Sequence, residues 1–253
     1  MNYLEVPSSY DINYVILSFV IAFAGSFVAL SAARRIIKPN GQISGFDLMS
    51  ASLALGGIGV WTMHFIGMLA LDLEARIGYS MAETIGSFVL ACLSTGFALT
   101  YVAKAPQHLG RLLIAGVALG LGVGAMHYLG MHSMRFGGQI IWSYSLIALS
   151  LVIAVVAATA ALWLAFNTRP LAVRLAAALI MALAVCAMHY TGMGAADFVC
   201  TSPADLLVTP RGWDIVYSDN LTQVVLILAV GITVLLSLDQ IAQRMAGAAR
   251  QNR

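Results

Sequence analysis

A six-residue motif that contains one histidine and two methionines occurs three times in this chain of 253 residues. The copies are Met63-His64-Phe65-Ile66-Gly67-Met68, Met126-His127-Tyr128-Leu129-Gly130-Met131 and Met188-His189-Tyr190-Thr191-Gly192-Met193. They take up three of the five histidines, and the second and third histidines follow the preceding one by 63 and 62 residues. Self-similarity at a fixed period indicates an internal repeat. We therefore expect the fold to bring the three copies together.

The spacing within each copy points to metal binding. Residues four apart on a helix share a face, so each histidine pairs with the methionine that ends its motif. The leading methionine lies about 100° round the helix and could reach a neighbouring helix. Thioether and imidazole together suit copper, and Cu(I) above all. Zinc held by three imidazoles, or a haem between two of them, would also be compatible. The predicted ligands are His64, His127, His189, Met63, Met68, Met126, Met131, Met188 and Met193.

A purely structural role is the alternative for these residues. A histidine in an apolar helix can be a hydrogen-bonded core residue, and methionines pack flexibly around it. Ionisable groups inside membranes are, however, usually functional. The segments between the motifs have also diverged further than the motifs themselves. Both observations favour the metal hypothesis.

Composition identifies an integral membrane protein. Only 9% of the residues are charged and 60% are hydrophobic, whereas soluble domains carry about 25% charged residues. The mean hydropathy is +0.89. The three cysteines form no disulfide framework. We find no Gly-rich phosphate loop and no Ser/His/Asp order, so we expect no enzymatic activity of this chain and no nucleic-acid partner.

The hydropathy pattern predicts an all-α, polytopic fold with seven transmembrane helices. A spanning helix needs about 20 apolar residues, and a lone strand cannot satisfy its backbone in lipid. The polar residues 1–10 do not resemble a signal peptide, so the first segment is expected to be a retained helix. The predicted helices are 12–33, 48–71, 82–103, 112–134, 144–166, 171–195 and 221–238.

Basic residues predict the orientation. Ten of the thirteen lysines and arginines fall after the first, third and fifth helices or in the C-terminal tail, and such residues stay in the cytoplasm. They are Arg34, Arg35, Lys38, Lys104, Arg111, Arg169, Arg174, Arg244, Arg250 and Arg253. We therefore expect a multi-pass protein of a bacterial inner membrane with its N-terminus outside. The motifs then lie at the outer ends of the second, fourth and sixth helices.

The repeat unit is a pair of helices, so all three repeats share one orientation and can be related by an axis along the membrane normal. This predicts three parallel helix pairs with pseudo-threefold symmetry, plus a seventh helix. Gly116, Gly120 and Gly124 have the spacing that allows close helix packing, which favours inner positions for the motif helices. The predicted units are a six-helix domain (12–200), an outer loop that could fold over the site (201–220), the seventh helix (221–238) and a cytoplasmic tail (239–253).

Four charged residues near the motifs could support the site. Asp72, Arg135 and Asp197 continue the histidine stripe by two turns, and we expect them to form an ion cluster above the histidines. The alternative is ordinary interfacial charges, since exposed pairs contribute little. Glu83 could accept a hydrogen bond from a ligand imidazole.

The motifs resemble the MHYT domain, which is named for Met-His-Tyr-Thr. Met188-His189-Tyr190-Thr191 matches in full, the second copy departs at Leu129, and the first departs at Phe65 and Ile66. The resemblance extends over about residues 12–200. It implies a bacterial membrane sensory module that binds copper through outer Met and His residues and senses oxygen, carbon monoxide or nitric oxide. Many such proteins carry a diguanylate cyclase, phosphodiesterase or histidine kinase domain after the last helix. This chain either stands alone or lacks such an output domain.

The leading functional hypothesis is a membrane signalling sensor with a copper site near its outer face. Its partners would be the lipid bilayer, a diatomic gas and a cytoplasmic signalling protein. The alternative is a metal-handling membrane protein, either a copper carrier or a zinc-dependent hydrolase. A carrier should place ligands along a path through the membrane, and this chain concentrates them at one depth. A hydrolase would need Asp72, Asp197 or Glu83 as its acid or base. A structural assembly partner is a third possibility.

Overall fold

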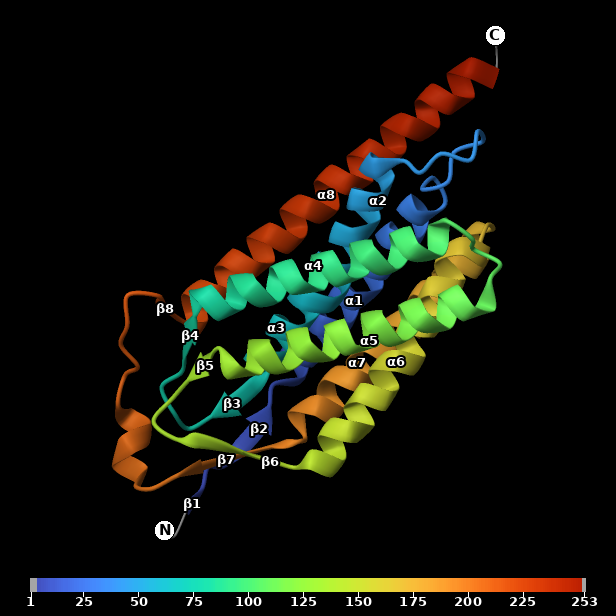
Figure 1. The fold of residues 1–253 in the computed structure, drawn as a ribbon. Coiled ribbons are helices and arrows are strands. Elements are labelled where there is room, and N and C mark those ends of the chain that lie inside the picture. Colours follow the sequence, from blue (N-terminus) through green and yellow to red (C-terminus); the bar gives the residue numbers. More distant parts are fainter. Residues whose placement is uncertain (1–3, 252–253) are drawn as a thin grey trace.

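The computed structural model describes residues 4–251, and within them seven helices are long and apolar enough to cross a membrane (Figure 1). The predicted seven-helix fold is confirmed. Six spans are single helices, and the second is built from three consecutive pieces. The single helices are α1 (Ile12–Ala33), α4 (Met81–Ala103), α5 (Leu109–His132), α6 (Tyr144–Asn167), α7 (Leu171–Met193) and α8 (Ser218–Gln251); the second span joins α2 (Gly45–Ser52), η1 (Leu53–Thr62) and α3 (Met63–Leu69).

Six of the spans form a closed ring. Each packs against the next along the chain, and α7 returns to α1. This arrangement agrees with three helix pairs around one axis. Helix α8 lies outside the ring against α1, η1 and α3. The second span is therefore covered on every side. Of its most apolar stretch of 18 residues, 89% are buried, whereas the corresponding shares are 44% for α5 and 39% for α7.

The predicted seventh span, 221–238, lies within the longer continuous helix α8. This helix begins near the strands and extends beyond the opposite end of the ring (Figure 1). Of the basic residues expected in the tail, Arg253 lies outside the described residues, and the side chains of Arg244 and Arg250 are not described either.

The middle of the second span is a π-helix of ten residues, η1. π-Helices are usually single-turn bulges, and they occur often at functional sites. Its wide turns are visible in the hydrogen bond that the Thr62 hydroxyl donates to the Gly57 carbonyl, five residues earlier, at 3.0 Å. The hydropathy pattern predicts an ordinary α-helix here, so the π-helix is a departure from that prediction. Because α3 begins directly after η1 ends at Thr62, the winding of η1 determines the direction in which the His64 side chain points from α3.

Eight short strands cover one end of the bundle, and none of them was predicted. They form three small antiparallel sheets in the orders β1-β7-β6, β2-β3 and β5-β4-β8. Their bounds are β1 Leu4–Glu5, β2 Ser8–Tyr10, β3 Leu71–Leu73, β4 Gly78–Ser80, β5 Met134–Arg135, β6 Gln139–Trp142, β7 Ala196–Cys200 and β8 Ile215–Tyr217. A short 3-10 helix, Pro203–Leu207, precedes β8. The sheets join segments from all three repeats.

We call this end of the bundle the strand end. The opposite end, the loop end, carries the connections 34–44, 104–108 and 168–170 (Figure 1). The strand end is the predicted outer side and the loop end the predicted cytoplasmic side.

Close packing of α1 on η1 generates a stability prediction. A Cβ added at Gly25 would lie 2.6 Å from the Cα of Gly59 and 2.8 Å from the carbonyl oxygen of Ala54. Since backbone must move to admit it, Gly25→Ala should destabilise the protein by about 1–3 kcal/mol. Thermal unfolding in detergent would show a lower Tm. Gly231→Ala in α8 is the matched control, because its Cβ would meet nothing within 4 Å. Equal Tm values for the two variants would contradict this packing.

Candidate metal centre

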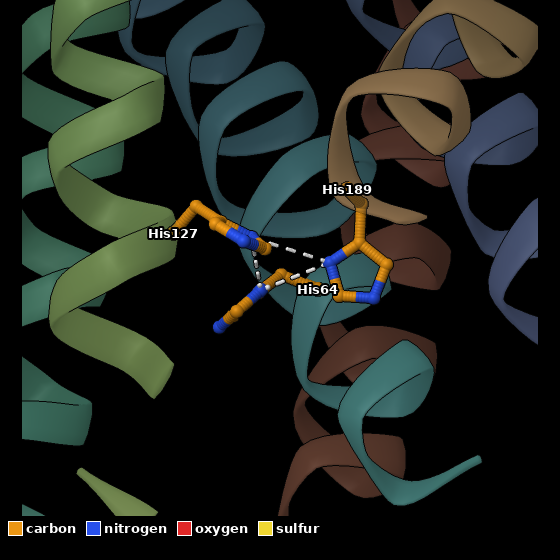
Figure 2. Close-up of side chains that lie close together, drawn as sticks. All are labelled: His64, His127 and His189. Carbon is orange, nitrogen blue, oxygen red and sulfur yellow. Dashed lines mark hydrogen bonds between the residues drawn. The ribbon is translucent and has the colours of Figure 1, made fainter. Parts of the chain in front are cut away.

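Three imidazoles converge on the axis of the bundle. His64 comes from α3, His127 from α5 and His189 from α7, and each is only 1% exposed. Their Nδ1 atoms point toward one another (Figure 2). The Nδ1–Nδ1 distances are 3.1 Å for His64 and His127, 3.2 Å for His64 and His189, and 3.4 Å for His127 and His189. The threefold motif repeat predicts this convergence at one depth.

Hydrogen bonds alone cannot stabilise all three contacts. Each Nδ1 either carries a hydrogen or presents a lone pair. In a closed triangle at least one of the three pairs must therefore join two like atoms, either two N–H groups or two lone pairs. Such a pair is repulsive, and burial removes the water that could screen it. The arrangement calls for something at its centre that accepts all three lone pairs.

A metal ion meets that requirement. The centre of a triangle with these sides lies about 1.9 Å from each nitrogen, close to the 2.0–2.1 Å of a zinc–imidazole bond. Among the described residues, these histidines form the one group of three or more His, Cys, Asp or Glu side chains with metal-binding proximity. Neutral imidazoles bound through Nδ1 would carry their hydrogen on Nε2. The residues present therefore fit a three-coordinate nitrogen site.

The glycine of each motif seats a histidine of another repeat. A Cβ on Gly130 would collide with Nε2 of His64, one on Gly192 with Nε2 of His127, and one on Gly67 with Nε2 of His189. The histidine of each repeat thus contacts the glycine of the next repeat, and the histidine of the third contacts the glycine of the first. The Nε2 atoms are buried against these backbones without a hydrogen bond of normal geometry. The fifth position of the motif is therefore glycine because an imidazole occupies the space of its side chain.

Aromatic residues follow the histidines and pack edge-on against them. The ring centroids lie 4.9 Å apart for His64 and Phe65, 4.8 Å for His127 and Tyr128, and 4.7 Å for His189 and Tyr190. The Tyr128 hydroxyl forms a hydrogen bond with Ser150 of α6 (2.6 Å), and that of Tyr190 with Ser18 of α1 (2.9 Å). The hydroxyls thus anchor the motif helices to the neighbouring helices.

Three further aromatic residues from the strands cover this layer. Tyr79 of β4 packs on Phe65 at 6.2 Å, Trp142 of β6 on Tyr128 at 5.6 Å, and Tyr10 of β2 on Tyr190 at 6.0 Å. Each repeat thus receives one ring, and the centre is closed from the strand end. Burial raises the pKa of both Tyr10 and Tyr79, so their phenols remain neutral. Sequence reasoning missed these residues, and aromatic residues in the connections are the signal that could have found them.

All six motif methionines are buried, with exposures of 3% or less. They are Met63, Met68, Met126, Met131, Met188 and Met193. The Nδ1 contacts join the three imidazoles to one another and involve no methionine. Methionine ligation therefore remains a prediction.

The predicted ion cluster of Asp72, Arg135 and Asp197 is not found. Arg135 instead forms a two-pronged ion pair with Glu83, with both N–O distances 3.0 Å. Among ion pairs of the described residues, none joins Arg135 to either aspartate, and both aspartates are exposed. Helices α3, α5 and α7 end before these positions, so the four-residue spacing no longer sets the side-chain direction.

Glu83 was predicted to support a ligand imidazole. It accepts instead from the exposed His132, whose Nδ1 lies 3.0 Å from Oε1 of Glu83. The cluster of Glu83, His132 and Arg135 lies at the strand end and ties α4 to β5. It does not contact the three buried imidazoles through any hydrogen bond or ion pair of the described residues.

A small apolar cavity lies within the bundle, one turn away from the imidazoles. Its lining includes Val60, Val123 and Val185, each four residues before a histidine, together with Met188. Its volume is about 40 Å³. Cavities lined by apolar side chains stay dry and can take up small apolar molecules. The remaining lining comes largely from alanines of α6.

The fold and site define a multi-pass membrane protein with threefold internal repeats and a buried three-histidine group. The sequence matches the MHYT family, described as "Bacterial signalling protein N terminal repeat", over residues 3–44, 57–115 and 120–178. The chain therefore belongs to the MHYT family.

Curated relatives are signalling proteins. The chain is 39% identical over 196 residues to the bifunctional diguanylate cyclase/cyclic di-GMP phosphodiesterase MucR of Pseudomonas aeruginosa, a match that covers 76% of this chain and 28% of MucR. It is 31% identical over 200 residues to the cyclic di-GMP phosphodiesterase NbdA of the same organism (76% of this chain, 25% of NbdA). The signalling protein YkoW of Bacillus subtilis is 29% identical over 205 residues (77% and 25%). The chain thus spans about a quarter of these relatives' length. No solved structure matches.

The contact between Gly130 and His64 generates a second prediction. Gly130→Ala should lower the Tm, because overpacking costs about 1–3 kcal/mol. His64→Ala removes the ring that the new methyl group would strike. The double variant should therefore be more stable than the sum of the two single effects predicts. Gly86→Ala in α4 is the control, since the nearest atom to its Cβ would be 3.9 Å away. Strict additivity in thermal unfolding would show that this contact does not form.

Proposed function

We propose that this chain is a membrane signalling sensor that binds copper through His64, His127 and His189 near its outer face. The observation that carries the proposal is the triangle of Nδ1 atoms, whose contacts hydrogen bonding cannot satisfy. Membership of a signalling family supports the sensory role. The signalling relatives support it too.

Copper is favoured over zinc by the surroundings of the imidazoles. Structural zinc sites are almost always four-coordinate and use Cys, His or carboxylate. Here the described structure groups three imidazoles, and each histidine lies in a motif with two buried methionines. Soft thioether ligands select Cu(I), which also binds small diatomic ligands such as carbon monoxide. Met68, Met131 and Met193, one turn beyond the histidines, would supply the additional donors.

The apolar cavity supports a diatomic gas as the sensed ligand. A volume of about 40 Å³ admits only a very small molecule, and the lining contains no charged side chain that could pair with an ion. Oxygen, carbon monoxide and nitric oxide are small and apolar enough to enter from the bilayer. The Val60, Val123 and Val185 side chains would admit such a molecule from the side away from the aromatic cover.

Helix α8 is the proposed route of the signal. It contacts α3, which carries His64, and the π-helix η1, and it extends past the loop end. A ligand transmits a signal only if it binds two helix arrangements with different affinity. We propose that ligand binding shifts the second span against α8, and that a cytoplasmic partner or domain responds. With the basic connections in the cytoplasm, the three imidazoles lie near the outer face of a bacterial inner membrane.

A metal-handling role is the alternative, and the site offers it little support. A carrier needs donors along the whole membrane path, but the cavity next to the imidazoles offers only Met181 and Met188 as soft donors among mainly aliphatic side chains. A zinc hydrolase needs a free acid or base near the metal. Glu83 is engaged with Arg135 and His132, and Asp72 and Asp197 are exposed in strands.

Removal of two histidines tests the metal site. Purified protein should contain copper, and His127→Ala combined with His189→Ala should lose it, because one imidazole cannot hold the ion. Elemental analysis by mass spectrometry measures copper and zinc in the same sample. His132→Ala is the matched control, since this histidine is exposed and outside the group. Unchanged copper in the double variant would refute the site, and stoichiometric zinc without copper would correct the metal.

Carbon monoxide tests gas binding separately. The reduced, copper-loaded protein exposed to carbon monoxide should show a C–O stretching band in its infrared spectrum. The band should be absent in the double histidine variant and retained in His132→Ala. A fully copper-loaded protein without such a band would count against gas sensing and would leave the metal site intact.

A further inference from the structure

A second, larger cavity lies at the loop end. Its volume is about 680 Å³, within the usual range of about 300–1,000 Å³ for ligand pockets. All three connections at this end contribute to its lining, with Lys38 from the first, Pro106 from the second and Arg169 from the third. The connections gather at this end in Figure 1. The cavity is therefore formed by all three repeats, as the metal centre is at the other end.

The lining is strongly basic. It contains four cationic side chains, Arg34, Arg35, Lys38 and Arg169, and one acidic side chain, Asp47. Asp47 is already satisfied, because its Oδ1 lies 2.7 Å from Nε of Arg35 and its Oδ2 accepts from the Ser44 hydroxyl at 2.7 Å. Three positive charges are thus left for a ligand.

Within the part of the chain that the structure describes, the other three cations of the lining have no acidic partner. Arg34, Lys38 and Arg169 are exposed and take part in none of the ion pairs of the described residues. Like charges around one cavity repel one another, so they are held there by the connections and not by mutual attraction. An anion between them would relieve this repulsion and could accept hydrogen bonds from both guanidinium groups.

The rest of the lining is apolar. Ala33, Ile37, Ala165 and Phe166 form apolar patches beside the cations. A small inorganic ion would leave them unused. The combination suits a molecule that carries phosphate groups on an apolar or aromatic body.

We propose that this basic cavity binds a water-soluble organic phosphate, such as a nucleotide. Because all three connections surround the cavity, it lies among them and not on the lipid-facing perimeter of the ring. A soluble anion can reach it from the aqueous phase more directly than a phospholipid head group can. The proposal is independent of the metal centre and of its occupant.

Binding of ATP to the full chain in a zwitterionic detergent tests the cavity. Isothermal titration at low ionic strength without magnesium should show saturable binding that weakens as salt is added. Binding of pyrophosphate should be weaker, because pyrophosphate cannot contact the apolar patches. Arg34→Gln combined with Arg169→Gln should reduce ATP affinity by at least about tenfold, since each removes a charged hydrogen bond.

Arg76→Gln combined with Arg211→Gln, both at the strand end, is the matched control. It removes the same charge from two exposed cations outside the cavity and should leave ATP affinity unchanged. An equal Tm for both double variants would show that each is folded. No saturable binding, or an equal loss in the control, would overturn the proposal. Tm measurements in nanodiscs with and without phosphatidylglycerol test whether a lipid head group binds instead. If phosphatidylglycerol raises the Tm through Arg34 and Arg169 and ATP has no effect, the cavity is a lipid site and the proposal is wrong.

Discussion

The structure depends on one packing interaction, the insertion of each imidazole into the space that a glycine leaves open in another repeat. His64 lies on Gly130, and the same contact recurs twice around the axis. This contact requires the second, fourth and sixth spans to pack so closely that only an imidazole fits between them. It also directs the three Nδ1 atoms toward a common point. The closed ring of helices, the π-helix and the strands all act to hold that approach.

Burial of three polar rings has a cost that the surroundings must offset. A buried polar atom without a well-formed hydrogen bond costs about 1–3 kcal/mol, and the Nε2 of each imidazole lacks a hydrogen bond of normal geometry. The aromatic cover contributes apolar burial and ring contacts, which are worth about 0.5–1.5 kcal/mol per pair. A cation at the centre would convert the repulsive Nδ1 contacts into three ligand bonds. Binding of such a cation would therefore stabilise the site and would be linked to folding.

The sequence was sufficient for the features that depend on hydropathy and repetition. Seven apolar stretches predict the spans, and the nearly equal spacing of His64, His127 and His189 predicts their convergence. Prediction from the sequence was wrong at the ends of the helices. Beyond Leu69, His132 and Met193 the chain enters strands, so extending the helical stripe to Arg135 gave the wrong partner. The winding of η1 was also missed, because helix type depends on packing against α1 and α4 more than on local composition.

The cyclic contact between glycine and histidine also bears on how such a protein could arise. No repeat seats its own imidazole, since the receiving glycine always belongs to another copy. A chain with a single repeat would need a second copy to bury its histidine in this way, and a trimer to complete the cycle of three contacts. Gene duplication and fusion would convert that oligomer into a monomer of fixed stoichiometry. The fused copies could then diverge, as the pairing of Arg135 with Glu83 in one repeat and the covering of another by α8 show.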